Sequence, residues 1–125
     1  MVGHTGSLLA TVCSMEALDL QLARILAVVD KLGGVAVITA DHGNADEMYE
    51  LDKKTGAPKA NKDGSFKAKT SHTLNPVPCI IYDNVTNGAY TVKADEGKFG
   101  LSNVAATRVK LLGYEAPAMW DESII

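Results

Sequence analysis

The apolar residues along the chain predict a helix that leads directly into a buried strand. From residue 14 to residue 32, apolar side chains recur at intervals of three and four residues, which is the pattern of an amphipathic helix. Gly33 and Gly34 follow and predict the end of the helix, because glycine readily adopts the left-handed conformation found there. Residues 35–39 are apolar on both faces and mostly β-branched, which is typical of a parallel strand covered on two sides. This order indicates half of a β-α-β unit and therefore a layered α/β fold.

A polar stretch separates this strand from a second apolar run. Residues 51–69 contain six lysines among turn-forming residues, so we expect an exposed excursion, either a plain loop or a short hairpin. Residues 77–82 are predicted to form a second strand. Pro78 fits only near its beginning or at a sheet edge, because proline cannot donate a hydrogen bond to a neighbouring strand.

The last third of the chain predicts one more helix. Residues 83–98 are rich in turn-forming residues, with 89–92 as a weak strand candidate. From residue 101 to residue 112, apolar side chains fall on one helical face. Ser102 is the candidate N-cap of this helix and Gly113 its candidate terminator. The predicted architecture is a partial sheet with flanking helices.

Composition and charge fit a soluble folded protein and exclude several classes of partner. The chain is 46% hydrophobic and 22% charged, close to ordinary globular domains. Its net charge of −3 argues against nucleic acid and anionic membranes, because both attract an excess of lysine and arginine. No apolar stretch approaches the roughly 20 residues that cross a bilayer, and no basic leader precedes an apolar N-terminal run. Small molecules or other proteins are the expected partners.

The two cysteines point to a reducing compartment. Cys13 falls in the first predicted helix and Cys79 in the second predicted strand, without the C-x-x-C spacing of zinc knuckles or redox dithiols. We expect both to be buried reduced thiols, which fits a cytoplasmic protein.

An acid and a histidine stand side by side where the first predicted strand ends. Asp41 and His42 precede Gly43, and in open α/β sheets binding groups gather beyond the carboxyl ends of the strands. A carboxylate and an imidazole suit zinc or manganese, but such ions take about four to six donors. The other histidines, His4 and His72, lie in loops of small uncharged residues. Lone histidines more often serve as surface or core residues, so spacing alone leaves both interpretations open.

Four ordered sequence strings carry a family resemblance over nearly the whole chain. They are MVGHTG (1–6), VITADHGNADEM (37–48), TSHTLNPVP (70–78) and FGLSNVAAT (99–107). In this order and at these separations, they resemble the cofactor-independent phosphoglycerate mutases, a family of the alkaline-phosphatase-like superfamily. The resemblance implies that residues 1–125 form the C-terminal segment of the metal-binding phosphatase-like domain, part of an alkaline-phosphatase-like α/β sandwich.

The resemblance also implies a chemistry. The family interconverts 3-phosphoglycerate and 2-phosphoglycerate through a phosphoserine intermediate, without 2,3-bisphosphoglycerate as a cofactor. Its site holds two divalent metal ions, usually manganese, with zinc, cobalt or magnesium as alternatives. By matching motifs, His4 and His72 would bind one ion. Asp41 and His42 would bind the other, which activates the serine nucleophile and stabilises charge on the transferring phosphoryl group.

Three further polar residues, Asn44, Asp46 and Glu47, match the family's motif just beyond the Asp-His pair. They would support the metal ligands or cap a helix, with a purely structural role as the alternative.

Several parts of the family's machinery are missing from this chain. In the family, an aspartate ligand directly precedes the position of Met1, and the serine nucleophile with another aspartate ligand lies far upstream. The substrate-binding arginines and lysines of the transferase domain are also absent. The family's nucleophile motif is not found around Ser7, Ser14, Ser71 or Ser102. We therefore expect the chain alone to have no mutase activity and to bind divalent metal weakly.

Two other interpretations remain open. A phosphatase or phosphopentomutase of the same superfamily would share the Asp-His-Gly motif and a downstream histidine, but it should lack the string at 70–78. A stand-alone, non-catalytic module would use the metal ligands structurally or would have lost their function. The resemblance also implies a sheet built from both ends of the family's chain, so a fragment should expose strand edges and an apolar face, which favours dimerisation or domain swapping.

Overall fold

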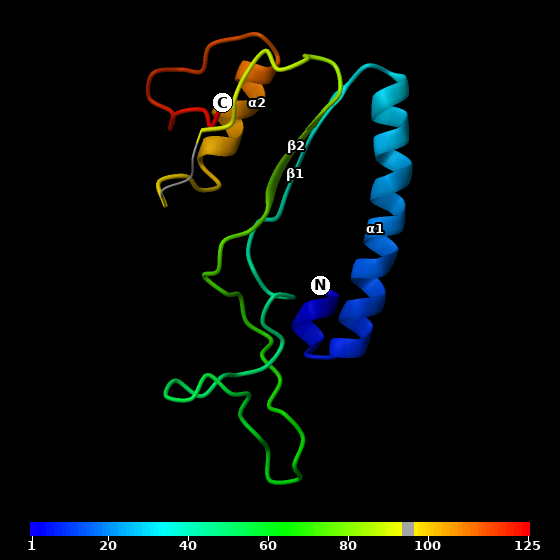
Figure 1. Cartoon of the computed structure of the whole chain (residues 1–125). Helices are drawn as coiled ribbons and strands as arrows, with labels where there is room; N and C mark the ends of the chain where they lie inside the picture. Colours follow the sequence, from blue (N-terminus) through cyan, green and yellow to red (C-terminus); the bar gives the residue numbers. More distant parts are fainter. Residues whose placement is uncertain (94–96) are drawn as a thin grey trace.

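Two strands lie between two helices, and the chain between the strands forms an irregular projection. This is a computed structural model, and it describes residues 1–93 and 97–125. Figure 1 shows α1 and α2 on opposite sides of the strand pair, with the green projection extending away from α2. The elements, in chain order, are η1 (Val2–Thr5), α1 (Leu8–Lys31), β1 (Val35–Thr39), β2 (Cys79–Asp83) and α2 (Asn103–Leu111).

Helix α1 starts earlier than its apolar pattern predicted and ends where predicted. Ser7 caps its first turn, because the Ser7 hydroxyl accepts a hydrogen bond from the amide three residues on, at 3.4 Å. At the other end Gly33 has a φ of +62°. The Gly33 amide donates to the Asp30 carbonyl at 3.0 Å, and the Gly34 amide donates to the Val29 carbonyl at 2.9 Å. This pair of bonds is a Schellman motif, so the glycines end the helix for the predicted reason.

The two strands pair antiparallel, with Val35 opposite Asp83 and Thr39 opposite Cys79. Residues 35–39 were predicted to form a parallel strand, but among the described residues β1 pairs only with β2, and this pairing is antiparallel. The apolar run could not specify direction, because a strand that is apolar on both faces fits either kind of ladder. Pro78 lies directly before β2, as predicted from its missing amide hydrogen. The fold class, a partial α/β architecture, is confirmed.

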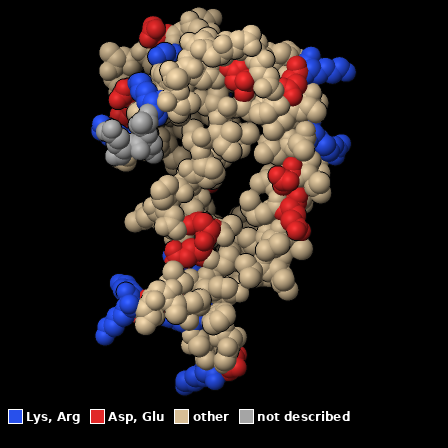
Figure 2. Space-filling model, in the orientation of Figure 1, with Lys and Arg blue, Asp and Glu red and all other residues tan. Residues whose placement is uncertain are grey.

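The excursion at residues 51–69 folds into a loose hairpin without regular strands. Its arms are joined by isolated antiparallel bridges, Tyr49 with Ala68 and Ala60 with Phe66 among them. Glu50, at its base, forms ion pairs with Lys59 at 3.4 Å and Lys67 at 2.9 Å. In Figure 2, lysine side chains extend from this projection into solvent.

Residues 89–92 form a bend and irregular structure instead of the weak strand predicted there. Asp83, at the end of β2, draws the following chain into turns. Its carboxylate accepts hydrogen bonds from the amides of Val85 at 2.8 Å and Thr86 at 3.0 Å, and from the Tyr90 hydroxyl at 2.7 Å. The Thr86 hydroxyl also donates to this carboxylate and has the largest effect on its pKa. Together these donors hold the pKa of Asp83 well below its ordinary value. Local side-chain bonds therefore replace strand pairing.

Helix α2 ends as predicted but begins differently. Gly113 has a φ of +81°, and its amide donates to the Lys110 carbonyl at 2.9 Å. Ser102 occupies the predicted N-cap position, but its side chain makes no capping hydrogen bond. The Asn103 side-chain oxygen accepts from the Gly100 amide at 2.7 Å, which ties the approach to α2 to its first residue without capping the helix.

The small core lies where the C-terminal residues pack on α2. The Thr107 hydroxyl is fully buried; it donates to the Asn103 carbonyl at 2.7 Å and accepts from the Ile124 amide at 3.1 Å. The buried apolar residues among those described are Met48, Ala106, Ile124 and Ile125.

Large apolar side chains are exposed along α1, including Leu9, Leu18 and Ile25. Both cysteines are exposed as well, so the prediction that they are buried is wrong. Cys13 lies on the uncovered surface of α1, and Cys79 lines an open cleft beside the histidines. No helix in the described part of the chain combines the length and the apolar character needed to span a bilayer.

Candidate metal centre

His4 is held by a short helix at the start of the chain. Element η1 closes with Gly6 in the left-handed conformation, at a φ of +74°. The His4 ring nitrogen Nδ1 lies 2.7 Å from the carbonyl oxygen of Thr70. A carbonyl oxygen only accepts, so Nδ1 carries the hydrogen and Nε2 keeps a free lone pair. This is how a backbone carbonyl commonly orients an imidazole that binds metal.

His42 lies just beyond the end of β1, as predicted for a group at the carboxyl end of a strand. Its Nδ1 lies 3.1 Å from the carbonyl oxygen of Gly43, so its Nε2 is also left with a lone pair. Nε2 lies 3.8 Å from the carboxylate of Asp41, which is too far for a direct hydrogen bond. A cation that binds both groups would bridge this gap.

His72 reaches the same place from the loop before β2. The Thr73 amide donates to the Gly43 carbonyl at 2.8 Å, which forms an isolated antiparallel bridge between the two residues. His42 directly precedes Gly43, and His72 directly precedes Thr73. One backbone bridge therefore brings the two histidine-bearing loops together.

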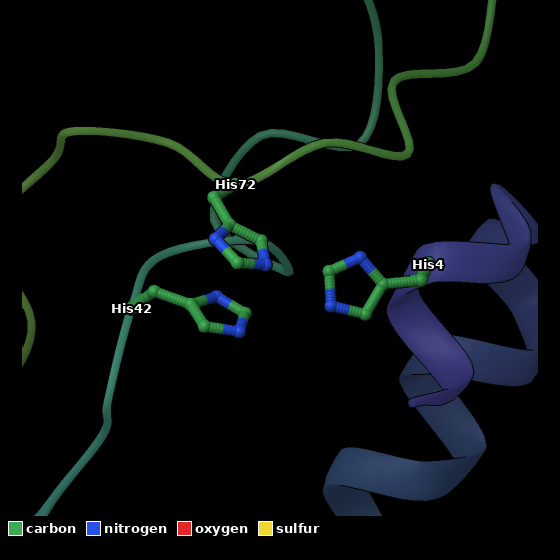
Figure 3. Close-up of side chains that lie close together, drawn as sticks. All are labelled: His4, His42 and His72. Carbon is green, nitrogen blue, oxygen red and sulfur yellow. The ribbon is translucent and has the colours of Figure 1, made fainter.

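The three imidazoles converge although their residues are far apart in the sequence (Figure 3). The rings of His42 and His72 are stacked, with centroids 3.6 Å apart and an interplanar angle of 11°. The His4 ring centroid lies 5.3 Å from that of His42 and 5.2 Å from that of His72. One ring nitrogen of each histidine lies within 4.8 Å of the others.

This donor set fits a divalent transition metal. Two nitrogens on one tetrahedral zinc ion lie about 3.4 Å apart, given Zn–N bonds of about 2.0–2.1 Å. The 4.8 Å limit within the cluster is wider than that, which is compatible with ligands divided between two neighbouring ions. Neutral imidazoles and a carboxylate are also the ligands that manganese, cobalt and zinc accept. The structure thus brings His4, His42 and His72 together and leaves the Asp41 carboxylate exposed beside them.

The polar residues after the Asp-His pair join the loops of the site. Asn44 donates to the Ser71 carbonyl at 3.2 Å. It also packs so closely on Gly3 that a Cβ on that glycine would lie 1.8 Å from the Asn44 side-chain oxygen. Glu47 pairs with Lys69 at 2.8 Å, and both side chains are half-buried. No helix begins in this segment, so the helix-capping alternative is wrong.

Asp46 contacts the loop of His72. Its carboxylate accepts a hydrogen bond from the Thr73 hydroxyl at 3.0 Å and another from the Asn75 side-chain amide at 2.5 Å. The Asn75 bond is the main reason that the pKa of Asp46 lies below its ordinary value. Sequence reasoning missed Thr73 and Asn75, because a neutral hydroxyl and amide in a loop carry no sign of their distant partner.

An apolar cleft of about 430 Å³ opens beside the histidines. His42 and His72 line part of it. The remaining wall is mostly apolar and comes from the segment before β2, from α2 and its approach, and from the C-terminus; it includes Val77, Phe99, Leu101, Val104 and Ile124. A largely apolar wall lowers the local dielectric and strengthens electrostatic interactions with any charged group bound there.

Comparison with known proteins agrees with this geometry. A family model described as the metalloenzyme superfamily matches residues 1–116. The chain is 46% identical over 125 residues to a Trypanosoma brucei brucei protein named 2,3-bisphosphoglycerate-independent phosphoglycerate mutase. It is 47% identical over 125 residues to a probable enzyme of that name from Leptospira interrogans. In both cases all of this chain is aligned, and it spans 22% of the relative's length.

A solved structure shows the same fold. The chain superimposes on a crystal structure of Leishmania mexicana phosphoglycerate mutase, determined at low cobalt concentration, with a TM-score of 0.91 and 44% identity. The match covers 98% of this chain and 22% of that one. The resemblance predicted from the four sequence strings is thereby confirmed. With its convergent imidazoles and its match to the family model over residues 1–116, the chain belongs to the metalloenzyme superfamily.

Proposed function

We propose that residues 1–125 are the C-terminal segment of the metal-binding domain of a 2,3-bisphosphoglycerate-independent phosphoglycerate mutase. The observation that carries the proposal is the convergence of His4, His42 and His72 within 4.8 Å, in a chain similar over its full length to enzymes of that name. Because it spans 22% of those relatives, the chain supplies a part of the whole site. A cytoplasmic location, as expected for an enzyme of central metabolism, belongs to the same proposal.

The chain's own residues would act as ligands of two divalent ions. His4 and His72 would hold one ion, and Asp41 with His42 would hold the other. When bound, these ions supply the positive charge that stabilises a transferring phosphoryl group and activates the attacking hydroxyl. The Nδ1 atoms of His4 and His42 bond to backbone carbonyls, which leaves the Nε2 lone pairs available to bind a metal ion.

Manganese is the proposed ion, with zinc, cobalt and magnesium as alternatives, and phosphoglycerate is the proposed substrate. Imidazole and carboxylate donors suit manganese, cobalt and zinc, and cobalt is named for the Leishmania crystal structure. No 2,3-bisphosphoglycerate is needed in the proposed reaction. The serine nucleophile would come from a part of the enzyme outside this chain.

Metal binding and activity can be tested separately on the purified chain. Substoichiometric Mn²⁺ should broaden the ring proton signals of the three histidines before other signals, because relaxation falls steeply with distance from the ion. Broadening that spares these rings would contradict the metal site. With Mn²⁺ present, the chain should not convert 3-phosphoglycerate to 2-phosphoglycerate, because it lacks the serine nucleophile. Conversion, with contaminating mutase excluded by a mock purification, would contradict the proposal that the nucleophile comes from outside this chain.

We further propose that the isolated chain associates with itself. Strand β1 pairs only with β2 among the described residues. A groove between β1 and α2 is lined mostly by apolar residues, Val35, Val37 and Val104 among them, with Thr39 and Arg108 as its polar members. An unpaired edge beside an apolar groove favours strand addition from a second copy. Sedimentation velocity should show a dimer that increases with concentration, and Val37→Lys should abolish it. The control Val85→Lys, at an exposed valine outside the groove, should leave the dimer intact. A monomer at the highest concentrations would contradict this proposal.

A further inference from the structure

The segments that carry His42 and His72 are joined by side-chain bonds as well as by one backbone bridge. The Asp46 carboxylate accepts from the Thr73 hydroxyl at 3.0 Å and from the Asn75 amide at 2.5 Å. Asp46 lies four residues after His42, and Thr73 lies one residue after His72. Each contact therefore ties one histidine-bearing loop to the other.

The close packing at this junction makes its geometry specific. Gly43 and Thr73 are both buried. A Cβ on Gly43 would lie 2.0 Å from the Thr73 hydroxyl oxygen and 2.9 Å from an Asp46 carboxylate oxygen. The hydroxyl and the carboxylate therefore occupy the space against the Gly43 backbone, and the two loops can approach only because residue 43 has no side chain.

We infer that Asp46 is a positioning residue that sets the separation of the His42 and His72 imidazoles by holding Thr73 against Gly43. This inference rests on the proposed metal site, because it adds to the proposed ligands a residue that holds them in place. The carboxylate suits the task because, when ionised, it offers acceptors to two donors at once. Asn44 and Glu47 bond to Ser71 and Lys69, on the other side of His72. Among these three polar residues, only Asp46 forms hydrogen bonds with the chain that follows His72.

The affinity of the 125-residue chain for Co²⁺ tests this role. Asp46→Ala should raise the dissociation constant by about ten- to a hundredfold, the usual cost of losing a group that orients a metal ligand. It should also change the Co²⁺ d–d absorption, because the two imidazoles would approach the ion differently. The matched control is Asp63→Ala. Asp63 also accepts from a hydroxyl and an amide, those of Ser65, but it lies in the exposed excursion, so affinity should stay within twofold.

A second pair of variants separates positioning from folding. Thr73→Val keeps the shape of the side chain but removes the hydroxyl, and it should reproduce the loss of affinity. Thr73→Ser keeps the hydroxyl and should restore affinity to near the original value. Equal affinities for these two variants would overturn the inference, as would an Asp46→Ala variant that binds Co²⁺ within twofold of the unaltered chain.

A metal-free measurement keeps this inference distinct from the proposed function. The stacked rings of His42 and His72 should give nuclear Overhauser effects between their ring protons. Asp46→Ala should remove these effects, while Asp63→Ala should leave them. If the unaltered chain binds no Co²⁺, the proposed metal site fails, and this measurement alone decides the role of Asp46. Unchanged effects in Asp46→Ala would then overturn it.

Discussion

Replacing His42 with alanine should weaken Co²⁺ binding to the 125-residue chain at least tenfold, or about 1.4 kcal/mol. His42 is central to the cluster, because its ring stacks on His72 and its Nε2 faces the Asp41 carboxylate at 3.8 Å. Loss of the imidazole leaves a ligand shell with too few donors for a transition metal. Isothermal titration calorimetry gives the dissociation constant directly. His72→Ala should have an effect of the same order.

The control for this experiment is Asp19→Asn, which removes an exposed carboxylate on α1. It should leave the dissociation constant within twofold, because exposed acidic groups attract cations only weakly through screened charge. A loss in Asp19→Asn that equals the loss in His42→Ala would indicate non-specific attraction by net charge. The assignment of His42 as a ligand would then be wrong.

Double variants extend this test to the division of ligands between two ions. If Asp41 and His42 share one ion, removing both should cost little more than removing His42 alone, because the shared site is already lost. If His72 belongs to another ion, His42→Ala and His72→Ala should abolish two separate binding steps. A double-mutant cycle measures this coupling. Additive losses for Asp41→Asn and His42→Ala would contradict a shared ion.

The sequence predicted best those features that depend on local chemistry. The glycines after α1 and α2 ended those helices as expected, because a left-handed residue and its two backbone bonds need only neighbouring residues. Asp41 and His42 were placed correctly at the end of a strand from periodicity alone. Local bonds also accompany an error, because Asp83 binds the amides of residues 85 and 86 and starts a run of turns, and residues 89–92 form no strand.

Features that depend on distant partners could not be predicted from the pattern. The direction of β2 was not encoded in an apolar run that fits either kind of ladder. His4 and His72 became ligand candidates through family resemblance, since nothing in a loop of small residues shows that it lies beside His42. The contact of Asp46 with Thr73 spans 27 positions. The two cysteines were wrongly predicted to be buried for the same reason. Whether a side chain is buried depends on which distant segments cover it, and the apolar pattern does not identify them.

Gly43→Ala should disrupt the candidate metal centre and also lower the stability of the chain. The new Cβ would lie 2.0 Å from the Thr73 hydroxyl oxygen, so the His72 loop would have to move away. That movement would stretch the 2.8 Å bond from the Thr73 amide to the Gly43 carbonyl. Overpacking of this kind costs about 1–3 kcal/mol. Urea unfolding followed by circular dichroism should show that loss, and Co²⁺ affinity should fall at least tenfold.

The matched control is Gly100→Ala, because a Cβ at Gly100 would meet no atom within 4 Å and its φ is not positive. It should change the free energy of unfolding by less than about 0.5 kcal/mol. Equal unfolding midpoints for Gly43→Ala and Gly100→Ala would contradict the prediction. The double variant Gly43→Ala with Thr73→Ala identifies the cause. Removing the hydroxyl removes the nearest atom that the new methyl group meets and leaves the Asp46 carboxylate oxygen at 2.9 Å, so the combined loss of stability should be smaller than the sum of the two single losses. Strict additivity would show that the cost comes from the Gly43 backbone rather than from the contact between the two histidine-bearing loops.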